Sequence, residues 1–551
     1  MARGIKNILF IMFDQLRFDY LSCAGHPWLH TPHIDALAQK GVRFDRAYVQ
    51  SPVCGASRMS TYTGRYLRSH GAVWNNVPLK VGEMTLGDHL RPLGMRTVLV
   101  GKTHMRTDRE GMARLGLAPD SVIGARVAEC GFDVFERDDG LRAEGPDGFY
   151  DPNGAQTYNE YLREQGYDSP NPWHDFANSG RNDDGSMASG WFLRHASKPA
   201  AIAEEHSETP YLTGRAMAFI EGAGDAPWLL HLSYIKPHWP YVVPAPYHDM
   251  YGPNQVLPVM RSEAERGTAH PVFKAFMDGP IGRAFSREDV RRRVIPAYMG
   301  LVKQCDDQMG RLFGWLEETG RMADTMIVLC SDHGDYLGDH WMGEKDLFHD
   351  PSVKMPLIIY DPSEAADPAR GSVSDALVES IDLAPTFVEA AGGAPPAHVL
   401  EGRSLLPILH GQTPPDWRSF AISEYDYAMH GAAKALDMPP DRCKLTMLAD
   451  ARWKFVHAEG FRPMLFDLEA DPGELSDLGA DPEYAAIIEM MYARLHEWAR
   501  LPRQRTTISD EAIQARRGKS RRTGIVLGAY DEADIDPEQA RIYSRTPPYE
   551  G

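Results

Sequence analysis

The sequence predicts an α/β protein in which helices sandwich a large, mostly parallel sheet, with a smaller antiparallel-sheet α+β subdomain toward the C-terminal end. Two observations predict the large sheet: short apolar runs recur along the chain, and segments with helical spacing lie between them. A third observation predicts the subdomain, because short strand-like runs follow one another closely after about residue 415. At 551 residues the chain can build one large core and an appendage.

The predicted strands of the large sheet are apolar runs bounded by turn signals. They are Ile8–Phe13, Thr97–Val100, Trp228–Tyr234, Met326–Cys330 and Pro356–Tyr360. The clearest predicted helix runs from Ile295 to Thr319, where apolar residues keep helical spacing and Gly320 suits the C-terminal stop. Residues 136–208 are rich in Gly, Asp, Asn and Pro, which indicates an irregular wall or lid. Residues 260–293 indicate a charged helical insertion.

The C-terminal part of the chain has a different pattern. Its strand-like runs are Ser419–Glu424, Lys444–Leu448, Lys454–His457 and Met464–Leu468, and a predicted helix follows at Tyr484–Arg500. We therefore expect a large domain at residues 1–414, a small subdomain at 415–501 and a tail at 502–551. The tail is basic at first and then apolar at Gly524–Tyr530, so we expect it to contact another subunit, in a dimer by preference. A frayed end is the alternative.

Composition excludes some partners. The chain has 58 Lys and Arg against 77 Asp and Glu, a net charge of −19, which argues against nucleic acid and anionic membranes as partners. Its six cysteines have no paired spacing, which favours a reducing compartment over a disulfide framework or a zinc site. The first apolar run is too short for a signal peptide and ends in Asp14-Gln15. No run is long enough for a membrane helix, so we expect a cytoplasmic protein.

Polar residues follow four of the predicted strands directly. These polar segments are Asp14-Gln15, Gly101–His104, Lys236–His238 and Ser331–Gly334. Open α/β sheets bind ligands beyond the carboxyl ends of their strands, so these segments predict one site. Within it, Asp14, Asp332 and His333 are candidate metal ligands, because hard divalent cations prefer carboxylates and a His admits manganese beside calcium. The alternative for each Asp is a helix cap after a strand.

Cys54 is the candidate reaction centre. It lies between a loop that contains Pro52 and an expected helix start, where backbone N–H groups and the helix dipole favour an anion. Arg58 follows four residues later and can lie on the same side of that helix. An isolated Cys is more often a small buried apolar side chain. Weaker candidates for a substrate wall are Trp74, Asn75, Asn76, Trp239 and Tyr241, with core packing as the alternative.

The segment Cys54-Gly-Ala-Ser-Arg58 resembles the Cys-x-Pro/Ala-Ser-Arg signature of the type I, formylglycine-dependent sulfatases of the alkaline-phosphatase-like superfamily. The resemblance extends from residue 8 to about residue 478 and is closest to the arylsulfatase and phosphonate monoester hydrolase branch. It implies an alkaline-phosphatase-like fold. It also implies that a separate formylglycine-generating enzyme oxidises Cys54 to formylglycine, whose hydrated aldehyde is the nucleophile.

The resemblance further implies one divalent metal ion, Ca²⁺ or Mn²⁺. Residue 54 and the polar residues after the first and fourth strands would hold it: Asp14, Gln15, Cys54, Asp332 and His333. Many sulfatases carry two adjacent Asp at the first position and Asn after the second Asp. This chain has Gln15 and His333 there instead, which keeps a site, removes one carboxylate and weakens the case for calcium.

The resemblance assigns the remaining roles residue by residue. Arg58 stabilises the nucleophile, and Lys102 and Lys345 neutralise charge on the transferring group. His238, helped by Lys345, gives a proton to the leaving group. His104, in the motif Gly-Lys-x-His, then removes a proton so that sulfate is expelled. Lys102 and His104 straddle Thr103, so on an extended segment both would point to one face.

These residues predict a sulfuric ester hydrolase that acts on small anionic esters, aryl sulfates foremost. Phosphonate monoester hydrolases have uncharged Tyr and Thr near the places of Lys102 and His104, which ranks the sulfate ester first. A phosphonate monoester hydrolase or phosphodiesterase is the alternative, because Asp14-Gln15, His333, the context Ser-Pro-Val-Cys54-Gly and the long C-terminal tail resemble that branch. A third interpretation is an inactive, metal-binding member in which Cys54 stays a thiol.

Overall fold

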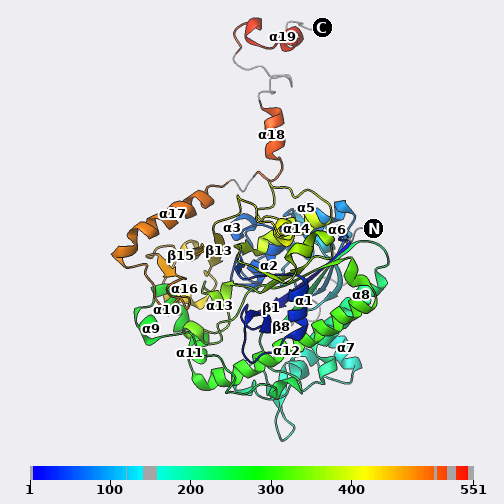
Figure 1. Cartoon of the computed structure of the whole chain (residues 1–551), viewed down its shortest axis with the longest axis vertical. Coiled ribbons are helices and arrows are strands. Elements are labelled where there is room, and N and C mark those ends of the chain that lie inside the picture. Colours follow the sequence, from blue (N-terminus) through cyan, green and yellow to red (C-terminus); the bar gives the residue numbers. More distant parts are fainter. Residues whose placement is uncertain (1–3, 119–120, 140–157, 502–504, 518–528, 544–551) are drawn as a thin grey trace. The chain divides into compact units, whose positions relative to one another are not determined.

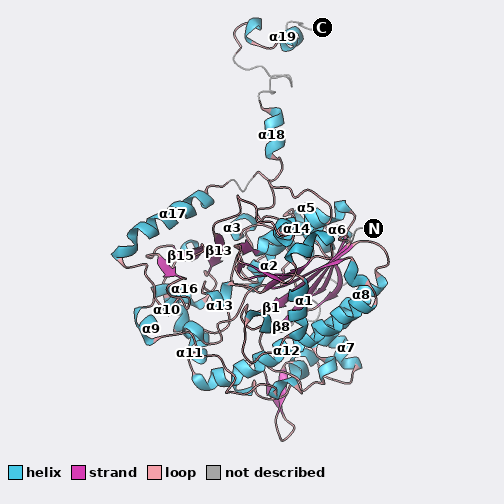
Figure 2. Ribbon diagram, in the orientation of Figure 1, coloured by secondary structure: helices cyan, strands magenta, loops and turns pink. Residues whose placement is uncertain are grey.

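A mixed sheet of eight strands lies at the centre of the larger part of the protein (Figures 1 and 2). The computed structural model describes residues 4–118, 121–139, 158–501, 505–517 and 529–543. The strand order is β11-β2-β10-β9-β1-β8-β4-β5. The bounds are β1 Asn7–Asp14, β2 Val42–Phe44, β4 Arg96–Gly101, β5 Asp133–Arg137, β8 Trp228–Pro237, β9 Thr325–Ser331, β10 Leu357–Tyr360 and β11 Ser372–Ser374.

The central strands are parallel, as expected. β1 pairs in parallel with β8 and β9, and β4 pairs in parallel with β8 and β5. Each predicted apolar run coincides with one of these strands or with β10. β10 is the exception in direction, because it runs antiparallel to both β9 and β2, and an apolar run carries no signal for direction. The predicted fold class is confirmed.

Alternate residues of the strands point to opposite faces of this sheet. Helices bury the apolar side chains on both faces. Phe10 of β1 belongs to the core on one face, and Ile11 belongs to the core on the other. The first face is covered by α2 Cys54–Thr63, α4 Leu86–Leu90 and α14 Leu383–Ala390. The second is covered by α1 Pro32–Lys40, α8 Glu208–Gly222 and α12 Glu288–Glu318 (Figure 1).

The long helix α12 begins earlier than its apolar spacing indicated, at Glu288 instead of Ile295. The added N-terminal turns are charged, with Glu288 and Asp289 in the first turn, where acidic side chains favour the helix dipole. Gly320 follows the helix with a φ of 73°, a left-handed conformation that glycine adopts without strain. The spacing of apolar residues therefore identified the buried stretch of the helix and missed its charged N-terminal turns.

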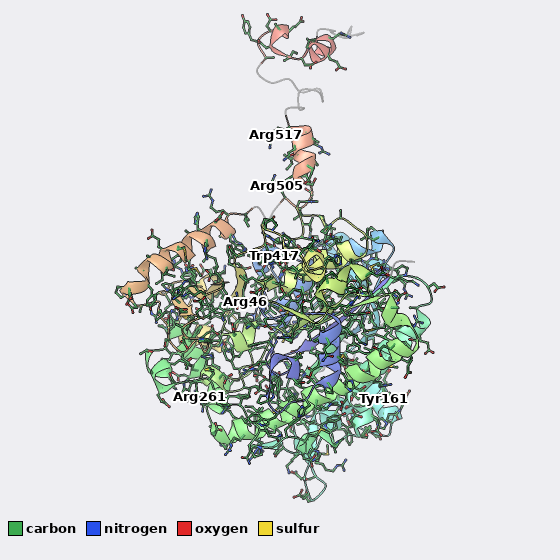
Figure 3. All side chains as sticks on the ribbon, in the orientation of Figure 1. Arg46, Tyr161, Arg261, Trp417, Arg505 and Arg517 are labelled. Atoms are coloured by element: carbon green, nitrogen blue, oxygen red, sulfur yellow. The ribbon has the colours of Figure 1, made fainter. Side chains whose placement is uncertain are left out.

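A second, four-stranded antiparallel sheet confirms the predicted C-terminal subdomain architecture. Its strands, in spatial order, are β13 Ala421–Asp426, β14 Lys444–Ala449, β15 Trp453–Ala458 and β16 Met464–Asp467. Helix α17, Ala485–Ala499, packs on it through Met491, Leu495 and Trp498. At the start of this region the indole of Trp417, marked in Figure 3, donates its Nε1 proton to the carbonyl of Leu377.

The remaining elements are short. They are α3 Leu67–His70, α5 Arg109–Leu115, α6 Val122–Ala128, α7 Tyr158–Glu164, α9 Glu263–Thr268, α10 Pro271–Met277, α11 Pro280–Phe285, α13 Asp350–Val353, α15 Leu406–Leu409, α16 Gly431–Ala435 and the strands β3 Ala47–Tyr48, β6 Ser179–Arg181, β7 Met187–Ser189 and β12 Val378–Glu379. Helices α9 to α11 bear out the predicted helical insertion at 260–293. In the described part of 136–208, α7 and the hairpin β6–β7 are short elements among loops.

The chain divides into two compact units, residues 1–395 with 400–500 and residues 396–399 with 501–551. The described residues of the smaller unit include the helices α18 Asp510–Arg516 and α19 Pro537–Tyr543. Of the apolar tail segment Gly524–Tyr530, only its last two residues are described, so the expected subunit contact stays a prediction, as do the boundaries at 414 and 501. Among the described helices, none combines the length and the apolar character needed to cross a membrane.

Candidate functional site

The carboxyl ends of four adjacent strands bring the predicted polar segments together. β9, β1, β8 and β4 are neighbours in the sheet, so the residues that follow them gather at one edge. Asp14 ends β1, Lys102 follows β4, His238 follows β8, and Asp332 and His333 follow β9. All five side chains are buried.

Cys54 lies at the centre of this edge. It is the first residue of α2, after Val53 in an extended conformation, and it is fully buried. The ammonium of Lys345 donates to the Cys54 sulfur at 2.9 Å, and Nε2 of His333 lies 3.0 Å from the same atom. The sulfur also lies 3.7 Å from Oδ1 of Asp14.

Position 54 favours a negative charge. Burial raises the pKa of the Cys54 thiol, but Lys345, His333 and Lys102 lower it, and the pKa falls well below its ordinary value. The same cations would stabilise an oxyanion at this place. The site therefore suits an anionic nucleophile whether residue 54 is a thiol or its oxidised form.

Arg58 joins the two carboxylates of the site. Its Nε donates to Asp332 at 2.8 Å and its Nη2 donates to Asp14 at 3.2 Å, while Nη1 donates to the hydroxyl of Ser233 at 2.7 Å. Arg58 reaches these partners because it lies one helical turn beyond Cys54 on α2. All of these side chains are fully buried, so the guanidinium offsets the cost of two buried carboxylates.

Asp14, Cys54, Asp332 and His333 can hold a metal ion, since one ligand atom from each lies within 4.8 Å of the others. Burial lowers the pKa of His333, but Asp332 and Cys54 outweigh it and raise this pKa to about 9. A protonated imidazole cannot ligate, so a divalent cation would have to displace this proton. The donor set of carboxylates and one imidazole fits manganese or a similar ion.

Gln15 carries a buried amide oxygen of the kind that a cation can bind. Its Nε2 donates to the carboxylate of Asp335 at 2.5 Å and to the hydroxyl of Tyr241 at 3.1 Å. Its Oε1 is buried and has no hydrogen-bond partner among the residues that the structure describes. The backbone N–H of Gln15 donates to Asp332 at 3.1 Å, which places the residue beside the cluster. An unpartnered buried amide oxygen is the kind of group that a bound cation satisfies.

Lys102 and His104 both reach this centre, but not by strand alternation. Lys102 donates to Asp14 at 2.5 Å, and although burial lowers the pKa of Lys102, Asp14 raises it above its ordinary value. The side chain of His104 lies close enough to Cys54 to lower the pKa of the Cys54 thiol, and His104 has a φ of 57°. The backbone is therefore left-handed at His104, and the extended conformation expected for 102–104 is wrong. The N–H of His104 donates to Asp139 at 3.1 Å.

His238 and Lys345 form a pair beside Asp14. Nδ1 of His238 lies 2.6 Å from the carbonyl of Trp239, and Nε2 lies 3.2 Å from the ammonium of Lys345. Burial lowers the pKa of His238 to about 4, so the neutral imidazole accepts a hydrogen bond from Lys345. Asp14 lies 3.9 Å from Nε2 of His238. In this arrangement Lys345 is the member of the pair that carries the exchangeable proton.

Three residues support the site through contacts that no sequence pattern indicates. Asn75, expected as a weak candidate for the substrate wall, accepts a hydrogen bond from the N–H of Gly55 at 2.8 Å and so anchors the start of α2. Asp335 holds Gln15, and Tyr425 of β13 donates to Asp346, next to Lys345, at 2.6 Å. A lone Asn, Asp or Tyr carries no pattern that predicts such a contact.

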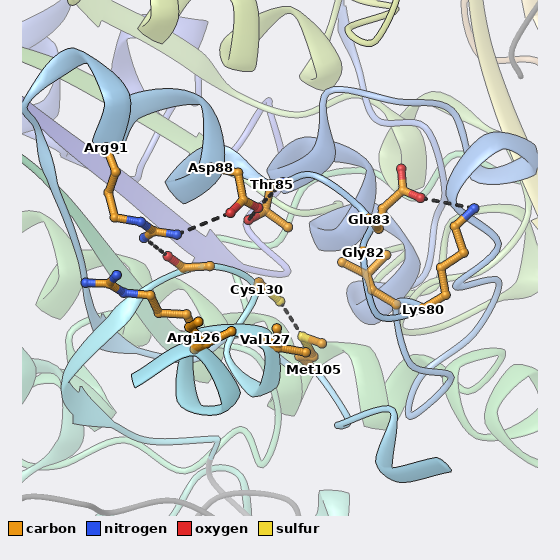
Figure 4. A pocket seen from close by; sticks show the side chains of 13 residues that line it. Lys80, Gly82, Glu83, Thr85, Asp88, Arg91, Met105, Arg126, Val127 and Cys130 are labelled. Carbon is orange, nitrogen blue, oxygen red and sulfur yellow. Dashed lines mark hydrogen bonds and ion pairs between the residues drawn. The ribbon is translucent and has the colours of Figure 1, made fainter. Parts of the chain in front are cut away.

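One cavity of about 230 Å³ is lined by residues that include Lys80, Met105 and Arg126 (Figure 4). Its wall includes Met105, whose sulfur lies 2.7 Å from the thiol of Cys130. Two cations in the wall are paired, Lys80 with Glu83 and Arg91 with Asp88 (Figure 4). None of the predicted site residues lines this cavity.

The comparisons with known proteins agree with this geometry. The model of the family described as Sulfatase matches residues 6–394. The chain belongs to the sulfatase family. A second model, described as N-sulphoglucosamine sulphohydrolase, C-terminal, matches residues 338–500 of this sulfatase-family chain.

Two curated relatives with different names are similar to most of this chain. The multifunctional alkaline phosphatase superfamily protein PehA of Trinickia caryophylli is 32% identical, over 90% of this chain and 95% of that protein. An arylsulfatase of Clostridium perfringens is 27% identical, over 88% of this chain and 92% of its own length. Among solved structures, the phosphonate monoester hydrolase SpPMH of Silicibacter pomeroyi is 28% identical with a TM-score of 0.79, covering 92% of this chain and 98% of that one.

Proposed function

We propose that this sulfatase-family hydrolase cleaves sulfate monoesters, aryl sulfates foremost, with Cys54 oxidised to formylglycine. The observation that carries the proposal is the convergence of Lys345, Lys102 and His104 on Cys54 in a buried setting. Two lysines and one histidine around one residue suit the transfer of an anionic group through that residue. The family membership supports a hydrolase.

The proposed reaction needs two further groups, a formylglycine at position 54 and one divalent cation. Formylglycine at position 54, made by a formylglycine-generating enzyme, would supply as its hydrate the oxygen that attacks sulfur. One divalent cation, Ca²⁺ or Mn²⁺, would be held by residue 54 with Asp14, Gln15, Asp332 and His333, and it would supply Lewis-acid chemistry. The unpartnered oxygen of Gln15 supports this ligand set.

The chain's own residues then divide the work. Arg58 keeps Asp14 and Asp332 in place through its hydrogen bonds to both. Lys102 and Lys345 offset negative charge on the transferring group. The Lys345–His238 pair delivers a proton to the departing oxygen, and His104, which lies near residue 54, accepts a proton from the hydroxyl of residue 54.

We also propose a cytoplasmic protein, since none of the six cysteines is in a disulfide, as a reducing compartment favours. The substrate we propose is a small anionic ester.

A phosphonate monoester hydrolase is the second candidate, and one observation favours it. The solved structure of such an enzyme covers nearly the whole chain with a high structural similarity. Sulfate and phosphonate monoesters both carry one negative charge near neutral pH, so overall charge cannot separate them. The difference lies in how Lys102 supports the group in the transition state.

The test compares matched phenyl sulfate and phenyl phosphonate esters with the wild-type protein and the Lys102→Ala variant. We expect higher kcat/KM on the sulfate, and a loss of roughly 100-fold in the variant on sulfate with a smaller loss on phosphonate. Lys80→Ala is the control, because Lys80 pairs with Glu83 at the separate cavity. Equal losses on both esters would remove the reason for ranking sulfate first, and a faster wild-type reaction on phosphonate would select the second candidate.

A further inference from the structure

Two side chains that take no part in the proposed reaction hold Gln15. Asp335 accepts the hydrogen bond from Nε2 of Gln15 at 2.5 Å, and Tyr241 accepts a second one at 3.1 Å. Tyr241 in turn donates its single proton to the same Asp335 oxygen at 2.6 Å, and the N–H of Leu337 donates to the other oxygen at 2.9 Å. Gln15, Asp335 and Tyr241 are all buried, so water does not compete for these contacts.

This hydrogen-bond network fixes the orientation of the side-chain amide of Gln15. Asp335 accepts from every neighbour that contacts it here, and the hydroxyl of Tyr241 has used its proton on Asp335. Both therefore require a donor from Gln15, and only the NH₂ end of the amide is a donor. The amide oxygen must then point to the other side, where it has no partner among the described residues.

We propose that Asp335 is a positioning residue that, with Tyr241, presents the amide oxygen of Gln15 to the metal and excludes a carboxylate from position 15. The inference rests on the divalent cation of the proposed function. A Glu at position 15 would bring a second carboxylate to within hydrogen-bond distance of Asp335 in a buried space, where like charges repel strongly. Asp335 thereby keeps the ligand at position 15 neutral.

A neutral ligand at position 15 changes which cation the site prefers. The remaining ligands are residue 54, the carboxylates of Asp14 and Asp332 and the imidazole of His333. Calcium affinity rises with the number of carboxylates, whereas an imidazole with amide and carboxylate oxygens suits manganese. Asp335 is therefore a determinant of metal selectivity, although it lies outside the ligand set.

The test measures metal binding by calorimetry and by metal content in the full-length protein, with residue 54 in the same state throughout. Asp335→Asn should weaken Mn²⁺ binding by about 10–100-fold, because an amide at 335 can donate to the Gln15 oxygen and turn the Gln15 nitrogen toward the metal. Gln15→Glu alone should also bind Mn²⁺ more weakly. The double variant Gln15→Glu with Asp335→Asn should recover affinity and shift the preference toward Ca²⁺, because the repulsion is gone.

Tyr298→Phe is the matched control. The Tyr298 hydroxyl donates to the backbone carbonyl of Gln15 at 2.7 Å, so its loss disturbs the same residue without touching the amide. We expect its Mn²⁺ affinity to stay close to that of the wild type. The melting temperature of each metal-free variant reports whether it is folded.

Three outcomes separate the hypotheses. Wild-type protein that binds no divalent cation contradicts the proposed function, and the inference with it. Wild-type binding together with an unchanged Asp335→Asn variant overturns the inference alone. A Gln15→Glu variant that binds more tightly than the wild type while Asp335 is present also overturns it.

Discussion

The positive charge of Arg58 compensates the buried carboxylates of this site. Its guanidinium contacts Asp14 and Asp332, and Lys102 provides a second cation for Asp14. Burial and, after it, Cys54 raise the pKa of Asp14, but Lys102, His238 and Arg58 outweigh them, so the pKa falls well below its ordinary value. A buried ion pair adds little stability by itself, whereas removing one partner leaves an uncompensated charge. We therefore expect the loss of either cation to destabilise the fold.

The first residue-scale prediction concerns Cys54. A Cys54→Ala variant should keep the melting temperature of the wild type within a few degrees and lose turnover on every ester, because covalent catalysis needs the nucleophile that residue 54 supplies. Peptide mass spectrometry of active wild-type protein should show formylglycine in place of cysteine at position 54. Fully active protein with only an alkylatable thiol there would contradict the mechanism, and a thiol in protein without activity would support the inactive-member hypothesis.

His231 of β8 is fully buried in the core. Tyr62 hydrogen-bonds its Nε2 at 2.8 Å and the carbonyl of Phe10 lies 3.2 Å from its Nδ1, so the neutral ring satisfies both nitrogens. Burial and the charge of Arg58 lower the pKa of His231 to about 3 from 6.5.

Between these two pKa values the unfolded chain binds a proton at His231 and the folded chain does not. The contribution of His231 to stability is therefore complete above about pH 6.5 and falls as the pH falls toward 3. A His231→Gln variant should lose part of this acid sensitivity, so its urea midpoint should change less than that of the wild type between pH 7 and pH 5. Parallel curves for the two proteins would show that His231 does not titrate in this way.

At the scale of elements, the segment from Leu337 to Leu347 sets the position of Lys345. Six non-glycine residues in it have left-handed backbones: Leu337, His340, Trp341, Glu344, Asp346 and Leu347. Each such residue costs energy, so the surroundings must hold the segment in place. Tyr336 donates its N–H to the carbonyl of Glu344 at 2.7 Å, and Tyr425 from the C-terminal sheet donates to Asp346 at 2.6 Å. The small sheet thus supports the loop that carries Lys345.

This arrangement predicts that Tyr425→Phe lowers kcat/KM by about 10-fold, because a small displacement of a charged group can cost up to about 100-fold. The loss should appear mainly in kcat. Tyr427→Phe is the matched control, because the Tyr427 hydroxyl is buried and has no hydrogen-bond partner in the part of the chain that the structure describes. Equal activity in the two variants would show that the Asp346 contact does not position Lys345.

In the whole molecule, the tail at residues 502–551 is the segment that we expect to take part in assembly. We propose that residues 502–551 contact a second copy of the chain, with a dimer favoured. Within the described residues of this unit, Tyr530 is 98% exposed, an unusual position for a large aromatic side chain in an isolated protein. Helix α18 ends in a basic turn at Arg516, which suits the acidic surface that a net charge of −19 implies.

Light scattering on the full chain and on a chain that ends at Arg500 tests this proposal. We expect the full chain to be a dimer or larger and the truncated chain to have a lower mass and a lower melting temperature, because a closed symmetric dimer buries such an arm twice. Unchanged oligomeric state, melting temperature and activity after truncation would identify the tail as a loose end.

The sequence pattern predicted the class of the fold, the strands β1, β4, β8, β9 and β10 of the large sheet and the four strands of the small one, but not β2, β5 or β11. Buried strands must be apolar, and polar residues placed directly after them must gather at one edge of a parallel sheet, so the sequence pattern alone groups Asp14, Lys102 and Asp332. The motif around Cys54 and Arg58 added the candidate reaction centre. Lys345 came only from its family motif, since no strand leads into it.

The contacts that hold these residues form only in the folded chain. The support of Gln15 by Asp335, of Asp346 by Tyr425 and of Gly55 by Asn75 joins segments far apart in the chain, and a hydrogen bond between such segments leaves no periodic trace in the sequence. The left-handed backbone at His104 likewise follows from the contacts around it and not from its residue type. Local sequence patterns indicate which residues are buried and where a strand ends. The hydrogen-bond partner of a side chain depends on distances between segments, which are set only when the chain has folded.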